Sequence, residues 1–309
     1  MSKTHVYDMI IVGGGPGGYT AAIYAASAGL DTLVLEKLSA GGQMALSEEI
    51  NNYPGFEEGV DGYTLAEKMQ RQAERFGART VYAEVERMEL AAEPKVLETS
   101  EGVFYARTVA LATGAGPREL GLADEAELVG RGVAYCAACD GMRYRGKTVV
   151  VVGGGNSAAG DALALSRIAE KVILVHRRDK LRATKAHDRP LSQAGNIEFR
   201  WNSAVVELLH GDKLSGVRLR DVNTGEETEL ACDGVFISVG RKPATELVKG
   251  QLELDKNGYI AADETTKTSL PGVYAVGDVR TKALRQVVTA VADGAAAVHM
   301  AEEYLAGGE

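Results

Sequence analysis

Met9-Ile-Ile-Val-Gly13-Gly-Gly15-Pro16-Gly-Gly18 is the stretch that decides the fold of this chain. It is an apolar segment typical of a buried strand, and it runs directly into a glycine-rich turn. The segment that follows, Tyr19–Ala28, is rich in alanine and has helical character, and Thr32–Glu36 reads as the next strand. A strand, a turn with G-x-G-x-x-G spacing and a helix together predict the opening of a dinucleotide-binding βαβ unit.

The same pattern occurs a second time. The turn that begins at Gly13 recurs at Gly153, within Val149-Val-Val-Val-Gly153-Gly-Gly155-Asn156-Ser157-Ala158. A helical segment, Ala158–Ala169, and a strand-like segment, Val172–His176, follow it. We therefore expect two dinucleotide-binding units in one chain. Glycines at strand ends also serve packing alone, which is the alternative for either turn.

Each turn needs its residues for a physical reason. Gly13 and Gly153 permit the tight turn, and Gly15 and Gly155 let the backbone approach a pyrophosphate. Gly18, replaced by Ala158 in the second turn, lets the helix pack closely on the strand. The helix starts then direct amide donors at the phosphates, so we also predict contacts from turn residues just before the expected helices, Pro16, Asn156 and Ser157.

The two turns differ where the ribose of the adenosine is expected. Glu36 lies 23 residues after Gly13 and supplies a carboxylate for ribose hydroxyls, which suits FAD or NAD. The equivalent position after Gly153 is His176, followed by Arg177 and Arg178, with Arg182 nearby. Guanidinium groups favour a 2′-phosphate, so the second turn predicts NADPH. A solvated basic turn is the alternative.

The first turn is therefore expected to hold the flavin, with help from late in the chain. Gly277-Asp278 follows an apolar strand, where the carboxylate can accept hydrogen bonds from ribityl hydroxyls. Arg285-Gln286-Val287 opens an apolar C-terminal segment whose start could approach the isoalloxazine ring. Taken alone, Asp278 could equally be a loop acid or a helix cap.

The pattern predicts an α/β chain with two Rossmann-like nucleotide-binding domains of three-layer ββα type. The second βαβ unit interrupts the first domain, with linkers after Gly114 and at Gly240–Pro243. We expect a flavin domain of residues 1–114 and 245–309, and an NADPH domain of residues 115–244. Antiparallel hairpins are expected over Val81–Val103 and Asn196–Leu230.

Composition narrows the class of protein. The 309 residues carry 34 basic and 43 acidic side chains, a net charge of −9, without a Lys/Arg-rich run, which disfavours nucleic-acid binding. No apolar run reaches the ~20 residues of a membrane span, and the N-terminus lacks the pattern of a signal peptide. With only three cysteines there is no disulfide framework, so we expect a protein of the reducing cytoplasm.

Two of the cysteines form a pair, Cys136-Ala-Ala-Cys139, followed directly by Asp140. This spacing permits a small-ring disulfide and predicts a redox-active dithiol, with Asp140 as a proton donor or acceptor. Half of a zinc site is the alternative, but the five histidines and Cys232 offer no ligand pair at suitable spacing. Asp140 could instead cap a turn before Gly141, and Cys232 is expected to be an inert buried thiol.

The combination of a flavin site, an NADPH site and C-x-x-C-D in the NADPH domain resembles the bacterial low-molecular-weight thioredoxin reductases over nearly the whole chain. Besides the two glycine turns and the cysteine pair, the matching motifs are Gly41-Gly42-Gln43, Asn52-Tyr53-Pro54-Gly55, Ala112-Thr113-Gly114, His176-Arg177-Arg178, Gly277-Asp278 and Arg285-Gln286. The resemblance adds Gly42, Gln43, Asn52, Thr113 and Gly114 to the expected cofactor contacts.

The resemblance implies a homodimer in which electrons pass from NADPH through FAD to the cysteine pair and then to thioredoxin. It implies that Cys139 faces the flavin, that Cys136 attacks the disulfide of thioredoxin, and that Asp140 is the acid–base residue. It also implies a rotation of the NADPH domain, because one flavin face cannot host the nicotinamide and the disulfide together.

Some residues depart from the family pattern. Asn156-Ser157 and Gly160-Asp161 differ from the usual Asp-Ser or Asp-Thr and the usual acidic pair, and Met142-Arg143 stands where aromatic residues are common.

Three other functions stay open: a flavoprotein serving a glutaredoxin-like or peroxiredoxin-linked partner, a ferredoxin-fed reductase, and a non-catalytic redox sensor. The first usually has an added N-terminal thioredoxin-like region, the second tends to lose the NADPH motifs, and the third does not need Cys136, Cys139 and Asp140.

Overall fold

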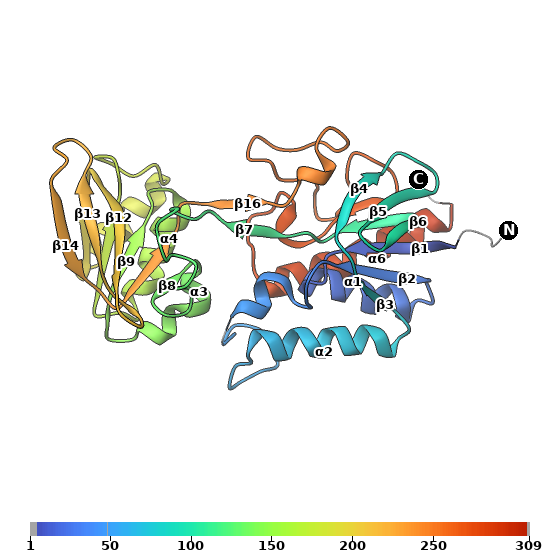
Figure 1. Ribbon diagram of the computed structural model, residues 1–309, viewed down its shortest axis with the longest axis horizontal. Helices are drawn as coiled ribbons and strands as arrows, with labels where there is room; N and C mark the ends of the chain where they lie inside the picture. Colours follow the sequence, from blue (N-terminus) through green and yellow to red (C-terminus); the bar gives the residue numbers. More distant parts are fainter. Residues whose placement is uncertain (1–4, 48, 308–309) are drawn as a thin grey trace. The chain divides into compact units, whose positions relative to one another are not determined.

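The computed structural model describes residues 5–47 and 49–307. The chain folds into two compact units (Figure 1). The first unit comprises the chain up to Gly116 together with the chain from Lys242 onward, and the second comprises Pro117–Arg241. The first unit is therefore built from both ends of the sequence.

The first unit is organised by one mixed sheet, which has seven strands within the described residues. Its strand order is β3-β2-β1-β6-β5-β4, and β17 also pairs with β6. Strands β3, β2, β1, β6 and β17 run parallel, whereas β4 and β5 are antiparallel to their neighbours. The strands are β1 Val6–Val12, β2 Thr32–Glu36, β3 Arg79–Tyr82, β4 Val85–Glu89, β5 Lys95–Thr99, β6 Gly102–Leu111 and β17 Val273–Ala275.

The apolar sequence of β1 is explained by its place in this sheet. It lies between β2 and β6, and Met9, Ile10 and Ile11 are fully buried. Alternate residues enter different cores: Met9 and Ile11 pack with the helices, and Ile10 packs with a second cluster on the opposite face. A parallel strand buried on both faces needs a continuous apolar run, which is what the sequence has.

Helices cover one face of this sheet (Figure 1). They are α1 Pro16–Ser27, α2 Gly62–Arg75 and α6 Val287–Leu305. Helices α1 and α6 approach closely because Gly17 and Gly294 meet between them, and a Cβ on Gly294 would run into the Gly17 carbonyl. Short 3₁₀ turns complete the unit: η1 Gly42–Leu46, η4 Glu246–Val248 and η5 Gly277–Val279.

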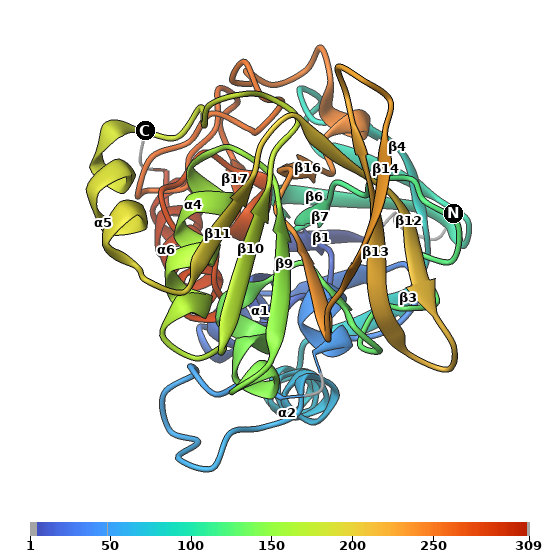
Figure 2. The same cartoon turned by 90° about the vertical axis from the view of Figure 1, so that its left-hand side faces the viewer.

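The second unit repeats the plan at smaller size. Its parallel sheet has the order β11-β10-β9-β15-β8, and β12-β13-β14 form a separate antiparallel sheet (Figure 2). The strands are β8 Val133–Ala134, β9 Thr148–Val152, β10 Lys171–Val175, β11 Ile197–Arg200, β12 Ser203–His210, β13 Leu214–Asp221, β14 Glu227–Ala231 and β15 Gly234–Ile237.

The two faces of the parallel sheet in the second unit are covered differently. The antiparallel sheet packs on one face, through Val205, Leu208 and Val217, and the helices pack on the other, through Ala158 and Ala162 of α4. The helical segments are α3 Ala137–Asp140, η2 Gly141–Tyr144, α4 Asn156–Ser166, η3 Lys185–His187 and α5 Asp188–Gln193. The second unit therefore has the predicted three-layer ββα architecture, and both units have the predicted Rossmann-like parallel strands.

Three local expectations differ from the structure. The helices after the glycine turns begin earlier than predicted, at Pro16 and Asn156, because the turns lead into them without a spacer. The expected hairpins over 196–230 are present only as β12-β13-β14, and strand β11 is wrongly included, since it pairs parallel to β10. Likewise, residues 81–82 belong to β3, which is parallel to β2. The short strands β7 Ala115–Pro117 and β16 Arg241–Pro243 lie where the chain crosses between units.

Candidate functional site: two glycine-rich turns and a disulfide

The first glycine turn is shaped by close backbone contacts. Gly13 has a φ of +105°, and a Cβ there would lie 2.5 Å from the carbonyl oxygen of Ala112. A Cβ on Gly18 would run into the carbonyl oxygen of Gly13. Around Gly15, by contrast, a Cβ would meet no heavy atom within 4 Å. Gly13 and Gly18 therefore close the turn, while Gly15 leaves its backbone accessible.

Glu36 is held directly over this turn. Its carboxylate accepts hydrogen bonds from the backbone N–H of Gly14 at 2.5 Å and of Leu38 at 3.2 Å. The N–H of Gly41 donates to the carbonyl of Gly14 at 2.7 Å, and a Cβ on Gly42 would lie 3.8 Å from the Cα of Gly15. The fold thus brings the predicted residues of this site together. Gly14 and Gly41 were not among the predicted contacts, although both stand inside the motifs.

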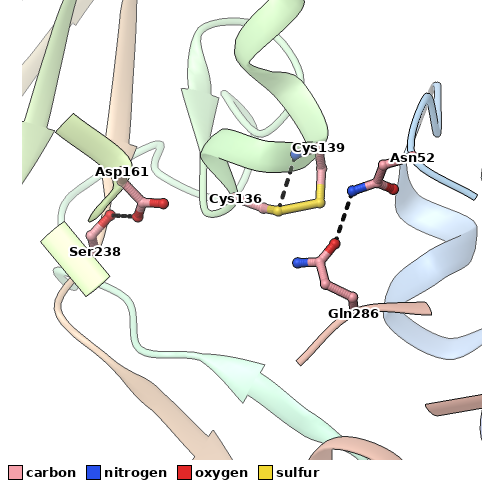
Figure 3. The surroundings of a disulfide bond; sticks show 6 residues. All are labelled: Asn52, Cys136, Cys139, Asp161, Ser238 and Gln286. Carbon is pink, nitrogen blue, oxygen red and sulfur yellow. Dashed lines mark hydrogen bonds between the residues drawn. A yellow bond between two sulfur atoms is a disulfide. The ribbon is translucent and has the colours of Figure 1, made fainter. Parts of the chain in front are cut away.

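The C-terminal residues of the site lie on one loop, residues 277–286, which begins with η5 and leads into α6. Gly277 has a φ of +75°, and Gln286 precedes the first residue of α6. The Gln286 side chain accepts a hydrogen bond from the amide of Asn52 at 3.0 Å (Figure 3). The Arg285 guanidinium turns back onto its own loop, donating to the carbonyls of Asp278 at 3.4 Å and Arg280 at 3.2 Å.

The other two residues predicted from the Ala-Thr-Gly motif follow strand β6. The Thr113 hydroxyl donates to the carbonyl of Ala244 at 2.8 Å, and Gly114 has a φ of +73°. Gln43 is exposed in η1, next to Gly42. Their neighbours Ala112 and Gly42 lie against Gly13 and Gly15, so both motifs adjoin the first turn.

Replacement by alanine should have opposite effects on stability at two of the glycines. Gly18→Ala should destabilise the protein by about 3 kcal/mol, because the new Cβ meets backbone that cannot move aside cheaply. Gly160→Ala, inside α4 with no heavy atom within 4 Å of its Cβ position, should stabilise it by about 0.5–1 kcal/mol. Chemical denaturation of both variants beside the parent measures this. Equal midpoints for Gly18→Ala and the parent would contradict the packing argument.

The second turn has the same plan but different chemistry. A Cβ on Gly153 would lie 2.5 Å from the carbonyl oxygen of Ser238, and Gly155 again has open space around it. Gly154, the counterpart of Gly14, is covered by the ring of His176, which a Cβ there would strike. The residue at the end of the second strand of each βαβ unit therefore lies against the middle glycine. It is Glu36, the last residue of β2, in one unit and His176, directly after β10, in the other.

The surroundings of His176 favour the neutral form of its imidazole. Burial lowers the pKa of its imidazole, and the charges of Arg182, Arg178 and Arg177 lower it further. Its Nε2 is buried and has no hydrogen-bond partner among the described residues. The positive charge beside the turn therefore comes from exposed residues, the three arginines together with Lys180.

The arginine loop is fastened to the second turn through the backbone. The N–H of Arg182 donates to the carbonyl of Gly154 at 2.6 Å. The N–H of Thr184 donates to the side-chain oxygen of Asn156 at 2.8 Å. Asn156 thus has a visible structural role, since it joins the start of α4 to this loop. Ser157 is exposed in the first turn of the same helix.

Asp161, at one of the departures from the family pattern, is a partly buried acid on α4. It accepts a hydrogen bond from the Ser238 hydroxyl at 2.5 Å (Figure 3). Burial raises the pKa of its carboxyl, and the Ser238 bond and the charge of Arg241 offset this only in part. The ionised form of the Asp161 carboxyl therefore lowers the stability of the folded protein.

This gives a pH-dependent prediction with a definite sign. Because the folded pKa of Asp161 is raised above the ordinary value of 3.8, this group lowers the stability as the pH rises from about that value through the folded pKa. Asp161→Asn should therefore raise the melting temperature at pH 7, and the gain should vanish near pH 3.5. Melting curves of parent and variant between pH 3.5 and 8 measure this. A gain independent of pH would contradict it.

The cysteine pair is joined as a disulfide, with 5.3 Å between the Cα atoms (Figure 3). Cys136 immediately precedes the short helix α3, and its sulfur accepts a hydrogen bond from the Cys139 N–H at 3.2 Å. Asp140 is the last residue of α3, and both sulfur-bearing residues are partly exposed. Cys232 is buried, and burial raises the pKa of its thiol to about 12, which makes it unreactive as a nucleophile.

Searching residues 5–47 and 49–307 finds no group of three or more His, Cys, Asp or Glu side chains that could hold a metal ion. Across the same residues, no helix has the length and apolar character needed to cross a membrane.

Comparison with known proteins agrees with this geometry. The family model described as pyridine nucleotide-disulphide oxidoreductase matches residues 7–294. The thioredoxin reductase of Treponema pallidum (strain Nichols) is 45% identical over 97% of this chain and 97% of its own length. The thioredoxin reductase of Streptomyces clavuligerus is 46% identical over 97% of this chain and 94% of its own length. The crystal structure of thioredoxin reductase from Streptococcus pyogenes MGAS5005 matches with a TM-score of 0.89 at 42% identity, covering 98% of this chain and 99% of that one.

Two dinucleotide-type turns and a disulfide between neighbouring cysteines are the features of a pyridine nucleotide-disulphide oxidoreductase, and the chain belongs to that family of flavoproteins. Within it, the chain is a member of the thioredoxin reductases, as the resemblance predicted. It is accordingly an oxidoreductase, and its family implies a flavin and a pyridine nucleotide as redox carriers.

The residues present fit such carriers at both turns. The open space at Gly15 and Gly155 is where a phosphate-bearing ligand needs access to the backbone. The first turn offers the Glu36 carboxylate beside it, and the second offers the unpartnered Nε2 of His176 and three exposed arginines.

Proposed function

We propose that this protein uses NADPH to reduce the disulfide of thioredoxin, with FAD and the pair Cys136/Cys139 between them. The observation that carries the proposal is the disulfide itself, which lies in the same unit as the arginine-bearing second turn. The names of the relatives, thioredoxin reductases at 45–46% identity over nearly the full chain, support it.

Each unit is assigned one cofactor. The domain of residues 1–114 and 245–309 binds FAD, with Glu36 receiving ribose hydroxyls and the loop 277–286 contributing Asp278 and Gln286. The domain of residues 115–244 binds NADPH, with Arg177, Arg178 and Arg182 around the 2′-phosphate. The opposite charges beside the two turns support this division, because a carboxylate repels a phosphate and guanidinium groups attract one. When bound, the two groups supply an electron pair to the disulfide.

The cysteines divide the exchange reaction between them. Two electrons break the Cys136–Cys139 bond and leave both sulfurs reduced. The Cys136 sulfur then attacks the disulfide of thioredoxin and forms a mixed disulfide, which the Cys139 sulfur resolves, releasing reduced thioredoxin and restoring the original bond. The hydrogen bond from the Cys139 N–H supports Cys136 as the attacking group, because a donor at the sulfur stabilises a thiolate.

Asp140 is assigned the proton transfers. It directly follows Cys139 in the chain and is the last residue of the same short helix. We propose that it protonates the thiolate that leaves when the disulfide is opened and takes the proton back when the pair is re-oxidised.

A rotation of the NADPH domain between the two half-reactions completes the proposal, since nicotinamide and disulfide need the same flavin face. The chain crosses between the units at two places, and each has a glycine with a left-handed backbone nearby, Gly114 with a φ of +73° and Gly240 with a φ of +117°. Such positions can absorb backbone change in a hinge. We further propose a homodimer in the cytoplasm.

The test is an anaerobic titration of the yellow holoenzyme with NADPH, followed by oxidised thioredoxin. We expect the flavin absorbance to bleach on the first addition and to return on the second, with stoichiometric reduction of thioredoxin. A colourless protein that cannot be reconstituted with FAD would overturn the proposal. So would a flavin that NADPH bleaches but that no thioredoxin from the same source re-oxidises.

A further inference from the structure

A buried charge cluster lies behind the loop 277–286. The Asp293 carboxylate on α6 accepts four hydrogen bonds within 3.0 Å. They come from the N–H of Gly277, from two nitrogens of the Arg280 guanidinium, and from the Lys282 ammonium at 2.7 Å. The side chains of Arg280, Lys282 and Asp293 are only 8%, 7% and 8% exposed.

The cluster fixes the loop at several points. Asp293 holds its start through Gly277, and Lys282 also donates to the carbonyl of Thr289 at 3.1 Å. The Thr289 hydroxyl in turn accepts the N–H of Gln286 at 3.1 Å. The loop residues assigned to the flavin therefore take their positions from contacts to α6 that involve this cluster.

The cluster also carries a surplus charge. Arg280 and Lys282 are two cations, and Asp293 is one anion, so these three side chains together carry one net positive charge. Asp263 is within electrostatic reach of Arg280, but it is exposed and therefore screened by water. A charge removed from water acts on its surroundings much more strongly than a charge on the surface.

We infer that Arg280, Lys282 and Asp293 are positioning residues that fix the loop 277–286 and raise the reduction potential of the bound flavin through their one surplus positive charge. This inference rests on the proposed assignment of FAD to the first unit. Reduction adds negative charge to the flavin, so a nearby buried cation favours the reduced form. The net charge of the three side chains then sets whether a variant raises or lowers the reduction potential. A change in the loop geometry alone has no such fixed sign.

Two single variants change this count in opposite directions. Lys282→Met removes a cation and keeps the Asp293 bonds to Gly277 and Arg280, so the potential should fall. Asp293→Asn removes the anion at nearly constant shape, so the potential should rise. In each, we expect at least a threefold change in the equilibrium constant against a reference dye, which is about 14 mV for a two-electron couple. The double variant restores the parent charge count and should return towards the parent value.

A matched control is available in the same unit. Lys95 is also buried and pairs with Glu93 at 2.8 Å, but its side chain lies against Gly272, at the opposite end of β17 from Gly277. Lys95→Met should therefore leave the flavin potential unchanged. It controls for the loss of a buried lysine as such.

The measurement is dye-equilibrated reduction of each purified holoenzyme, with bound FAD counted from its absorbance. Opposite shifts for Lys282→Met and Asp293→Asn support the inference. No shift in either, shifts of the same sign, or an equal shift in Lys95→Met overturns it. If Asp293→Asn does not fold, the sign of Lys282→Met against Lys95→Met decides. A parent chain that binds no FAD would instead reject the proposed function, so the two failures are distinguishable.

Discussion

Replacing Cys139 by serine should lower the rate of NADPH-driven thioredoxin reduction by at least about a thousandfold. The disulfide joins only Cys136 and Cys139, and a serine hydroxyl can neither form that bond nor accept an electron pair through it. Flavin binding should be retained, because the cysteines lie in the second unit and the FAD assignment rests on the first. Steady-state assays with NADPH and oxidised thioredoxin measure the loss, and flavin absorbance measures the retained binding.

Cys232→Ser is the matched control for this result. The third cysteine is buried and unpaired, and its raised pKa keeps it protonated, so its replacement should leave turnover within a factor of about two. Rapid single-turnover reduction of the flavin by NADPH should persist in Cys139→Ser. Full thioredoxin reduction by Cys139→Ser would exclude the pair from the reaction.

The second large effect is expected on coenzyme choice. Replacing Arg177 and Arg178 together by alanine should lower kcat/KM for NADPH about a hundredfold or more, because each charge-assisted hydrogen bond to the 2′-phosphate contributes about 1.5–3 kcal/mol. The value for NADH should change little, since NADH lacks that phosphate. The ratio of the two kcat/KM values measures the effect, and a parent enzyme equally active with both coenzymes would contradict it.

Two further features sharpen this test. Arg220 is an exposed arginine in the antiparallel sheet of the same unit, paired with Glu227 at 2.7 Å, and Arg220→Ala should leave the coenzyme ratio unchanged. Trp201 is the single tryptophan of the chain, and its ring lies edge-on to that of His176 at 6.5 Å between centroids. Its fluorescence should therefore report NADPH binding directly, and the double arginine variant should need a higher NADPH concentration for the same change.

The parts that sequence could predict are those set by local patterns. The strand Thr32–Glu36 was predicted at its observed bounds, since an apolar run after a glycine-ended helix has few alternatives. The two βαβ openings follow from the same logic, and the apolar segment expected to open at Arg285–Val287 is helix α6. The fold class and the family followed because the motifs stand in a fixed order. The finer cofactor contacts and the roles of Asp140 and the hinge remain predictions.

Other features depend on residues that are distant in sequence. The direction of β11 is set by its pairing with β10, and its short run of residues is equally typical of a hairpin strand. The bond from Gly14 to Glu36 spans 22 residues, so neither residue reveals it alone. Asp293 gave one usable signal, an acid within the Ala-rich stretch that forms the first part of α6. Its partners Arg280 and Lys282 become evident only once the loop is folded back on α6.

The interrupted architecture of the first unit has a consequence for synthesis on the ribosome. Strand β6 leaves the ribosome long before β17, its partner, because the whole inserted unit is translated between them. At ordinary translation speeds the interval is roughly 10–30 s. The nascent chain must therefore keep an incomplete sheet edge from pairing wrongly for longer than many domains take to fold, whereas the inserted unit emerges as one continuous segment and can fold first.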